Sequence, residues 1–372
     1  MRAHDGTPFE TIEIGGYEVR CGFVSVNEVD FEPDGANRLD ALVEVAAFSC
    51  NYRDKALVLR AATTPSEHGF YVIGSELAGR VAAVGSGVSA VGPGDRVMVD
   101  GCFGYGEQPW GLPTNHASRC LQALPARKLM RVPDSMSDSV AAAFSIGGQT
   151  SFSMVRRAGV GPGSEVLVTA GSSNTALFLL QAARFAGATV SVTTTSAAAG
   201  ERLRALGAEQ AFVIEHDGPR FDRADGIAEY AKEVGGFAAV LDPFFDLYLE
   251  RAVPVLAGFG VYVSCGLERQ FPARAEALAG FAPRPVLNDV VLGAALPRNV
   301  SIVANCLGST ADLERAVEAF GAGQLHVELD CVMEADGAGA FLSRTYLERD
   351  RFGKVVCRYG DASSRNPESS RS

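Results

Sequence analysis

The segment VLVTAGSSNTALFLLQAARFAGATVSVTTTS, residues 166–196, decides how the rest of this chain is interpreted. It begins with an apolar run at 166–168 that is rich in β-branched residues and too short for a helix, which predicts a buried strand. Residues 176–185 have helical spacing, with one buried face and one mixed face. Gly187 ends this helix, and residues 189–193 supply a second strand of β-branched residues.

The turn between the first strand and the helix is made of small residues. The first turn of a helix leaves backbone N–H groups unpaired and carries partial positive charge, so an anionic pyrophosphate can bind there when no large side chain holds it away. Strand, tight turn, helix and strand within about thirty residues predict a dinucleotide-binding βαβ unit. The G-x-G-x-x-G/A pattern is incomplete, because Gly171, Ser173 and Ala176 take its three positions. An ordinary α/β connection is therefore the alternative interpretation.

The residues after the second strand favour NADPH over NADH. A protein that prefers NAD usually places Asp or Glu at this point to hold the ribose 2′-hydroxyl. Here the strand runs into Thr195 and Ser196, and Arg202 and Arg204 follow shortly after. Hydroxyls and a guanidinium suit a 2′-phosphate, because its oxygens accept charge-assisted hydrogen bonds. The alternative is that both arginines only solvate an exposed helix face.

Length and composition indicate a globular protein of two domains. The chain has 372 residues, of which 47% are hydrophobic and 21% charged, and this supports substantial cores. A net charge of −11 without a basic cluster argues against nucleic-acid binding. The start MRAHDGTPFE has no apolar signal region, and no run approaches the roughly eighteen apolar residues of a membrane span. We therefore expect a cytoplasmic protein that binds no membrane and whose eight separate cysteines stay reduced.

The region before the βαβ unit has short strands separated by Gly and Pro, which indicate a β-rich domain. It contains the strings NYRD at 51–54, GSELAG at 74–79, GSGV at 85–88 and PGDRV at 93–97. These strings resemble the medium-chain dehydrogenase/reductase superfamily, in particular its zinc-free branch of quinone oxidoreductases and enoyl reductases. The resemblance extends over nearly the whole chain in the same order.

The resemblance implies an α/β architecture in which a Rossmann doubly wound parallel sheet is inserted into a β-rich GroES-like catalytic domain. Residues 1–152 and 309–360 would form the catalytic domain and residues 153–308 the nucleotide-binding domain, with a disordered tail at 361–372. It also implies an active site between the domains and a homodimer formed through edge strands of the Rossmann sheet.

Relatives that bind catalytic zinc use Cys, His and a further Cys as ligands. In this chain those positions match Asn51, Ser75 and residues 145–148, which contain neither cysteine nor histidine. Glu76 alone would not retain zinc, because a tetrahedral site needs three protein ligands. We therefore expect no metal. Without a Lewis acid, reduction of a C=C bond conjugated to a carbonyl is easier to support than carbonyl–alcohol exchange, because the charge spreads into an enolate.

The resemblance thus implies an NADPH-dependent, zinc-independent oxidoreductase that reduces an activated C=C bond in a small-molecule enone, enoyl thioester or quinone. One alternative is a zinc-free dehydrogenase or reductase acting on C=O or C=N in a biosynthetic pathway. Another is a non-catalytic nucleotide-binding protein of the same fold.

The candidate catalytic residues are Tyr52, whose hydroxyl can donate a proton or bind an enolate oxygen, and Asn51, which would line the site. A tyrosine in an apolar loop is more often part of the core. Thr150 and Lys354 match cofactor-contacting positions of the family, although helix capping and an exposed surface lysine explain them equally well. The candidate cofactor-binding residues are Thr150, Gly171, Ser172, Ser173, Asn174, Thr175, Thr195, Ser196, Arg202, Gly266 and Lys354.

Overall fold

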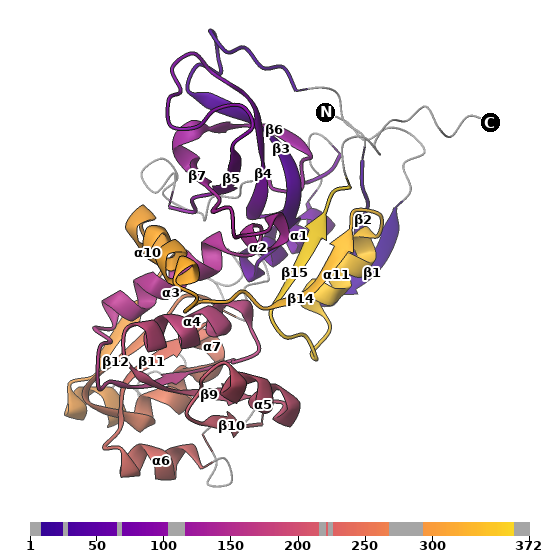
Figure 1. The fold of residues 1–372 in the computed structure, drawn as a ribbon. Coiled ribbons are helices and arrows are strands. Elements are labelled where there is room, and N and C mark those ends of the chain that lie inside the picture. Colours follow the sequence, from indigo (N-terminus) through magenta and orange to yellow (C-terminus); the bar gives the residue numbers. More distant parts are fainter. Residues whose placement is uncertain are drawn as a thin grey trace. The chain divides into compact units, whose positions relative to one another are not determined.

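The computed structural model describes residues 9–24, 29–64, 69–102, 116–215, 221, 226–267 and 293–360. The predicted tail at 361–372 lies outside these residues. The chain divides into two compact units, one formed by residues 1–146, 329–349 and 354–372, the other by residues 147–328 and 350–353. Figure 1 shows the elements of both units.

The first unit is built on a seven-stranded sheet that combines both ends of the chain. Its order is β14-β15-β3-β4-β5-β7, and β6 pairs with β3. The yellow strand β15 lies antiparallel to the indigo strand β3 (Figure 1). In β3 every second residue from Ala41 to Ala47 is fully buried, as expected for a strand with one face on the core. The strands are β3 (Asp40–Ser49), β4 (Glu76–Val84), β5 (Arg96–Val99), β6 (Leu121–Pro125), β7 (Leu129–Arg131), β14 (Leu329–Glu334) and β15 (Lys354–Arg358).

A separate hairpin and several short helices complete the described part of this unit. The hairpin joins β1 (Glu10–Ile14) to β2 (Tyr17–Cys21). The helices are α1 (Tyr52–Thr63), the 3-10 helix η1 (Ala126–Lys128), α2 (Asp138–Ala141) and α11 (Ala338–Tyr346). Helix α1 begins directly after β3, so the capping residue Asn51 is held at the end of a buried strand.

The second unit contains a six-stranded parallel sheet with the order β10-β9-β8-β11-β12-β13. The chain runs outward from β8 on one side and returns to β11 on the other, which is the doubly wound topology. The predicted fold class is confirmed. The strands are β8 (Glu165–Val168), β9 (Thr189–Thr194), β10 (Ala211–Val213), β11 (Phe237–Asp242), β12 (Leu256–Ser264) and β13 (Ser301–Ala304). The helices are α3 (Ser145–Arg157), α4 (Asn174–Phe185), α5 (Ala197–Ala205), α6 (Ile227–Glu233), α7 (Phe245–Ala252), η3 (Val253–Val255), η5 (Leu296–Arg298) and α10 (Thr310–Gly321).

Helix α10 belongs to the second unit, whereas the nucleotide-binding domain is predicted from the sequence at residues 153–308. Arg156 of α3 forms an ion pair with Asp312 of α10 at 2.9 Å, and α10 lies beside α3 (Figure 1). Helix α10 also packs on α4. The second compact unit accordingly contains residues 147–328 and 350–353, and the predicted domain bounds stay a prediction.

In the central strand β8, Val166, Leu167 and Val168 have no exposed surface. Helix α4 begins two residues earlier than predicted, because the Ser173 side chain caps it by accepting from the Ala176 N–H. Gly187 follows the helix with a φ of 91°, a left-handed conformation that glycine adopts readily. No helix in the described part of the chain is both long and apolar enough to cross a membrane.

Candidate functional site

The turn between β8 and α4 lies at the point where the direction of the sheet order reverses, which is where ligands bind in folds of this kind. Gly171 donates its N–H to the Thr193 carbonyl of β9 at 2.7 Å. A Cβ atom at this position would lie 2.8 Å from the side chains of Val192 and Leu203. The contact with β9 therefore requires this glycine, whereas the sequence analysis explained it by the approach of a phosphate.

The start of α4 offers hydrogen-bond donors that fit a pyrophosphate. The N–H groups of Asn174 and Thr175 occupy the first helical turn and have no acceptor within the helix. The Nδ2 atom of Asn174 is buried and has no hydrogen-bond partner among the described residues. A Cβ atom at Gly147 would lie 2.9 Å from this Nδ2 atom, so the glycine leaves space beside it. A buried donor without a partner, next to a helix N-terminus, fits an anionic oxygen.

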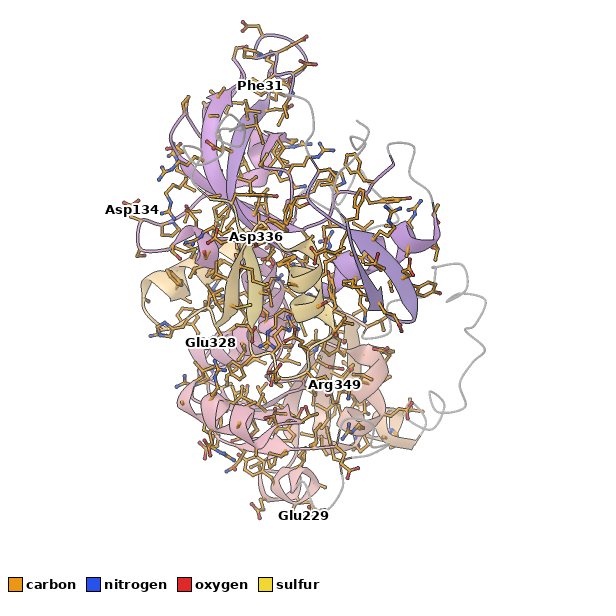
Figure 2. The ribbon with its side chains drawn as sticks, turned by 90° about the vertical axis from the view of Figure 1, so that its right-hand side faces the viewer. Phe31, Asp134, Glu229, Glu328, Asp336 and Arg349 are labelled. Carbon is orange, nitrogen blue, oxygen red and sulfur yellow. The ribbon has the colours of Figure 1, made fainter. Side chains whose placement is uncertain are left out.

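Hydroxyl groups and one guanidinium follow at the end of β9. The hydroxyls of Ser172 and Thr194 lie 3.4 Å apart, Thr195 is exposed, and the Ser196 hydroxyl caps α5 by accepting from the Ala199 N–H. Arg202 is on the same helix, where it forms an ion pair at 3.2 Å with Glu328, a residue labelled in Figure 2. This donor set also fits a phosphate group, so the residues of this unit are compatible with the predicted cofactor.

A buried carboxylate lies at the same edge of the parallel sheet. Asp242 ends β11 and is fully buried. Its Oδ1 atom accepts hydrogen bonds from the Thr169 hydroxyl at 2.5 Å and the Phe244 N–H at 2.8 Å, and its Oδ2 atom accepts from the Tyr262 hydroxyl. Burial raises the pKa of Asp242 to about 6, although the hydrogen bonds from Thr169, Tyr262 and Phe244 act in the opposite direction. The sequence analysis missed this cluster, although an acid directly after an apolar strand was a usable signal.

A second buried carboxylate lies in the first unit, where it accepts hydrogen bonds from several segments. Glu76, the first residue of β4, is fully buried. Its Oε2 atom accepts from the Lys354 ammonium and from the Asn51 amide, both at 2.7 Å, while Oε1 accepts from the Ile146 N–H, also at 2.7 Å. Four segments that are far apart in the sequence therefore meet at one side chain.

Every polar atom of the Asn51 side chain is engaged within this cluster. Its amide nitrogen donates to Glu76 and, at 3.0 Å, to the Ser75 hydroxyl, and its Oδ1 atom accepts from Lys354 at 2.5 Å. The Asn51 carbonyl accepts from the Tyr346 hydroxyl at 3.1 Å. The polar atoms of the Asn51 side chain are therefore used within the cluster.

Lys354 was expected beside the pyrophosphate, but the structure directs its ammonium to Glu76 and Asn51 instead. The side chain is 2% exposed and that of Glu76 is 0% exposed. The physical reason is the cost of burying a carboxylate without a counter-charge, which an adjacent ammonium offsets.

The remaining predicted residues are distributed over both units. Tyr52 is half-buried at the start of α1, with its ring edge-on to Tyr346 at 6.4 Å and the Lys55 ammonium 5.3 Å from its centroid. Thr150 is buried on α3, and the Gly266 carbonyl accepts from the Phe245 N–H at 2.9 Å. The structure thus brings Asn51, Ser75 and Lys354 together in one unit and groups the turn residues 171–175 with 195 and 196 in the other.

The positions that match zinc ligands of the relatives converge, but with other residue types. Asn51 and Ser75 are hydrogen-bonded to each other, and the Ser145 hydroxyl lies 3.4 Å from Glu76. Within the described ranges, no group of three or more His, Cys, Asp or Glu residues could hold a metal ion.

The chain is similar in sequence to known proteins over part of its length. Residues 37–165 match the alcohol dehydrogenase GroES-like domain family. The erythronolide synthase EryA2 of Saccharopolyspora erythraea is 32% identical over 69% of this chain and 7% of its own length. The crotonyl-CoA reductase of Streptomyces avermitilis is 28% identical over 52% of the chain and 49% of its own length. The chain therefore spans less than a tenth of the synthase and about half of the reductase.

The similarity extends to the fold. The structure of a mycobacterial protein complexed with NADPH superposes with a TM-score of 0.67 and 23% identity, covering 90% of this chain and 94% of that one. At this identity the likeness shows the fold alone. Both units, their order along the chain and the family match agree with the resemblance found in the sequence. Residues 37–165 therefore belong to the alcohol dehydrogenase GroES-like domain family, and the fold of the two units is consistent with the medium-chain dehydrogenase/reductase superfamily that the sequence resembles.

Proposed function

We propose that this protein is an NADPH-dependent, zinc-independent reductase of an activated C=C bond in a small-molecule enone, enoyl thioester or quinone. The observation that carries the proposal is the donor set at the β8–α4 turn. There the Asn174 amide nitrogen, which has no partner among the described residues, adjoins a helix N-terminus, and the sequence has no acid between β9 and residue 201. The similarity to a crotonyl-CoA reductase supports the substrate class. The fold shared with a protein complexed with NADPH supports the cofactor.

The residues of the nucleotide-binding unit would hold the cofactor, which supplies the hydride when bound. The Asn174 and Thr175 N–H groups and the Asn174 amide would bind the pyrophosphate. The hydroxyls of Thr195 and Ser196, together with Arg202, would bind the 2′-phosphate.

In the catalytic-domain unit, the cluster around Glu76 fixes Asn51 and hence the first turn of α1. This presents the Tyr52 hydroxyl as the candidate group that donates a proton or holds an enolate oxygen. A phenol is suited to either task because its O–H is a donor and its ordinary pKa keeps it protonated near neutral pH. A homodimer and a cytoplasmic location remain part of the proposal.

The first test is binding. Purified protein is titrated with NADPH and with NADH while the nicotinamide fluorescence is followed. Saturable binding with preference for NADPH supports the cofactor assignment. Saturable binding of neither would favour a non-catalytic protein of the same fold.

The second test locates the reaction. The oxidation of NADPH that carries deuterium at C4 of the nicotinamide is followed with crotonyl-CoA, a simple enone and a quinone, and with an aldehyde and a cyclic imine as comparison substrates. Deuterium at the β-carbon of the crotonyl-CoA or enone product supports C=C reduction. Deuterium on the former carbonyl or imine carbon would favour the alternative reductase.

A further inference from the structure

The guanidinium of Arg202 is held from two sides within the nucleotide-binding unit. Its Nη2 atom lies 3.2 Å from the Glu328 carboxylate, and its central carbon lies 3.7 Å from the centre of the Phe352 ring. The side chains of Arg202 and Glu328 are 53% and 26% exposed. The guanidinium is therefore accessible to a ligand but already has a carboxylate partner.

Arg202 is also connected to the β8–α4 turn through a short chain of contacts. Phe352 precedes Gly353, whose N–H donates to the Ser172 carbonyl at 3.1 Å. The Ser172 hydroxyl lies 3.4 Å from that of Thr194 at the end of β9. The arginine and the proposed phosphate-binding turn are thus tied to the same segment of chain, residues 350–353.

Gly353 and Glu328 approach each other closely at this place. Gly353 has a φ of 96°, and a Cβ atom there would lie 3.0 Å from the Glu328 Cβ atom. Glu328 is therefore held beside the segment that carries Phe352. The same close packing holds its carboxylate near Arg202.

We propose that Glu328 is a specificity-determining residue that competes with the 2′-phosphate of NADPH for the Arg202 guanidinium. This inference rests on the proposed function. A phosphate dianion and a carboxylate both bind a guanidinium through its N–H donors, and Glu328 already occupies the Nη2 donor of Arg202. Two anions on one guanidinium also repel each other, so Glu328 opposes binding of the 2′-phosphate.

The competition affects the two cofactors differently. NADH carries a 2′-hydroxyl in place of the phosphate, so it leaves the pair between Arg202 and Glu328 intact. Phe352 contacts the face of the guanidinium, and a cation–π contact leaves the N–H donors available for either anion. Phe352 therefore holds the arginine in place during the exchange.

The test compares the dissociation constants of NADPH and NADH for the wild type, Glu328→Gln, Arg202→Gln and the double variant. We expect Glu328→Gln to tighten NADPH binding by about two- to fivefold, the range of a half-exposed ion pair, and to leave NADH binding unchanged. Arg202→Gln weakens NADPH binding selectively. In the double variant the effect of Glu328→Gln disappears, because the two residues act through one contact.

Arg204→Gln is the matched control, since Arg204 lies on the same helix and donates to the Ala211 carbonyl at 3.1 Å instead. Its NADPH-to-NADH ratio should equal that of the wild type. Tight NADPH binding that Glu328→Gln does not change, or changes equally for both cofactors, would overturn the role of Glu328 alone. Absence of saturable binding of either cofactor to the wild type would overturn the proposed function as well.

Discussion

Glu76 in the first unit and Asp242 in the second unit are both carboxylates without exposed surface, but they have different partners. Glu76 of the catalytic-domain unit is hydrogen-bonded to the Lys354 ammonium. Asp242 of the second unit accepts from the neutral groups of Thr169, Tyr262 and Phe244. The comparison teaches that burial alone does not decide how a carboxylate contributes to the stability of the fold. The contribution of Glu76 depends on a cation that is distant in the sequence, and the contribution of Asp242 depends on pH.

The largest effect should come from removing the cation. Lys354→Met would leave the Glu76 carboxylate buried without a counter-charge, and we expect a loss of about 3–5 kcal/mol in the free energy of unfolding. Denaturant titration measures it. The double variant with Glu76→Gln serves as the control, since it removes the charge that Lys354 balances and should recover much of the loss. A loss below about 1 kcal/mol for the single variant would show that the pair does not support this unit.

The second effect is the pH dependence contributed by Asp242. Its pKa in the folded protein, about 6, lies above its ordinary value of 3.8, so the native state binds more protons than the unfolded state between these values. The stabilisation is complete below about pH 4 and is lost as the pH rises through about 6, amounting to roughly 2–3 kcal/mol.

Asp242→Asn should remove this dependence. The free energy of unfolding of the wild type and the variant is measured from about pH 4 to pH 7, and their difference is compared across the range because other groups titrate in both proteins. The wild type should lose stability relative to the variant as the pH rises. A constant difference would mean that Asp242 does not take up the proton.

The helices and strands near these two carboxylates could be predicted from the sequence, because apolar runs, small-residue turns and glycines determine local structure over a few residues. Helix α4 was predicted at 176–185 and is found at Asn174–Phe185. The proximity of Asn51 and Ser75 could be predicted from the family resemblance, because both match zinc-ligand positions of the relatives. The strand Thr189–Thr194 was predicted to within one residue.

The partners of the carboxylates could not be predicted in the same way. Glu76 and Lys354 are separated by 278 positions, so no spacing rule connects them. Thr169 and Tyr262 meet Asp242 only because β8, β11 and β12 are adjacent in the sheet. That adjacency is a property of strand order, which the local pattern of each strand does not contain.

A smaller effect should follow from Asn51→Ala, which removes the group bridging Glu76, Ser75 and Lys354. We expect a loss of about 1–2 kcal/mol in the free energy of unfolding, since the buried hydrogen bonds of its side chain are lost. If Asn51 acts by positioning, turnover falls while the KM of the substrate changes little. Lower turnover at unchanged stability would instead indicate direct contact with the reacting group.

The smallest effect is expected from Tyr262→Phe, which removes one of the three donors to Asp242. The phenylalanine ring keeps the packing, so the loss in the free energy of unfolding should be about 1 kcal/mol at low pH, where the carboxyl is protonated. The loss should grow at neutral pH, because a hydrogen bond stabilises the ionised carboxylate more than the neutral acid.

Since the Tyr262 hydrogen bond lowers the pKa of Asp242, its removal should shift the pH at which stability is lost above about 6. Denaturant titrations of both proteins over the same pH range measure this shift, and an unchanged midpoint would show that Thr169 and Phe244 alone determine the titration of Asp242.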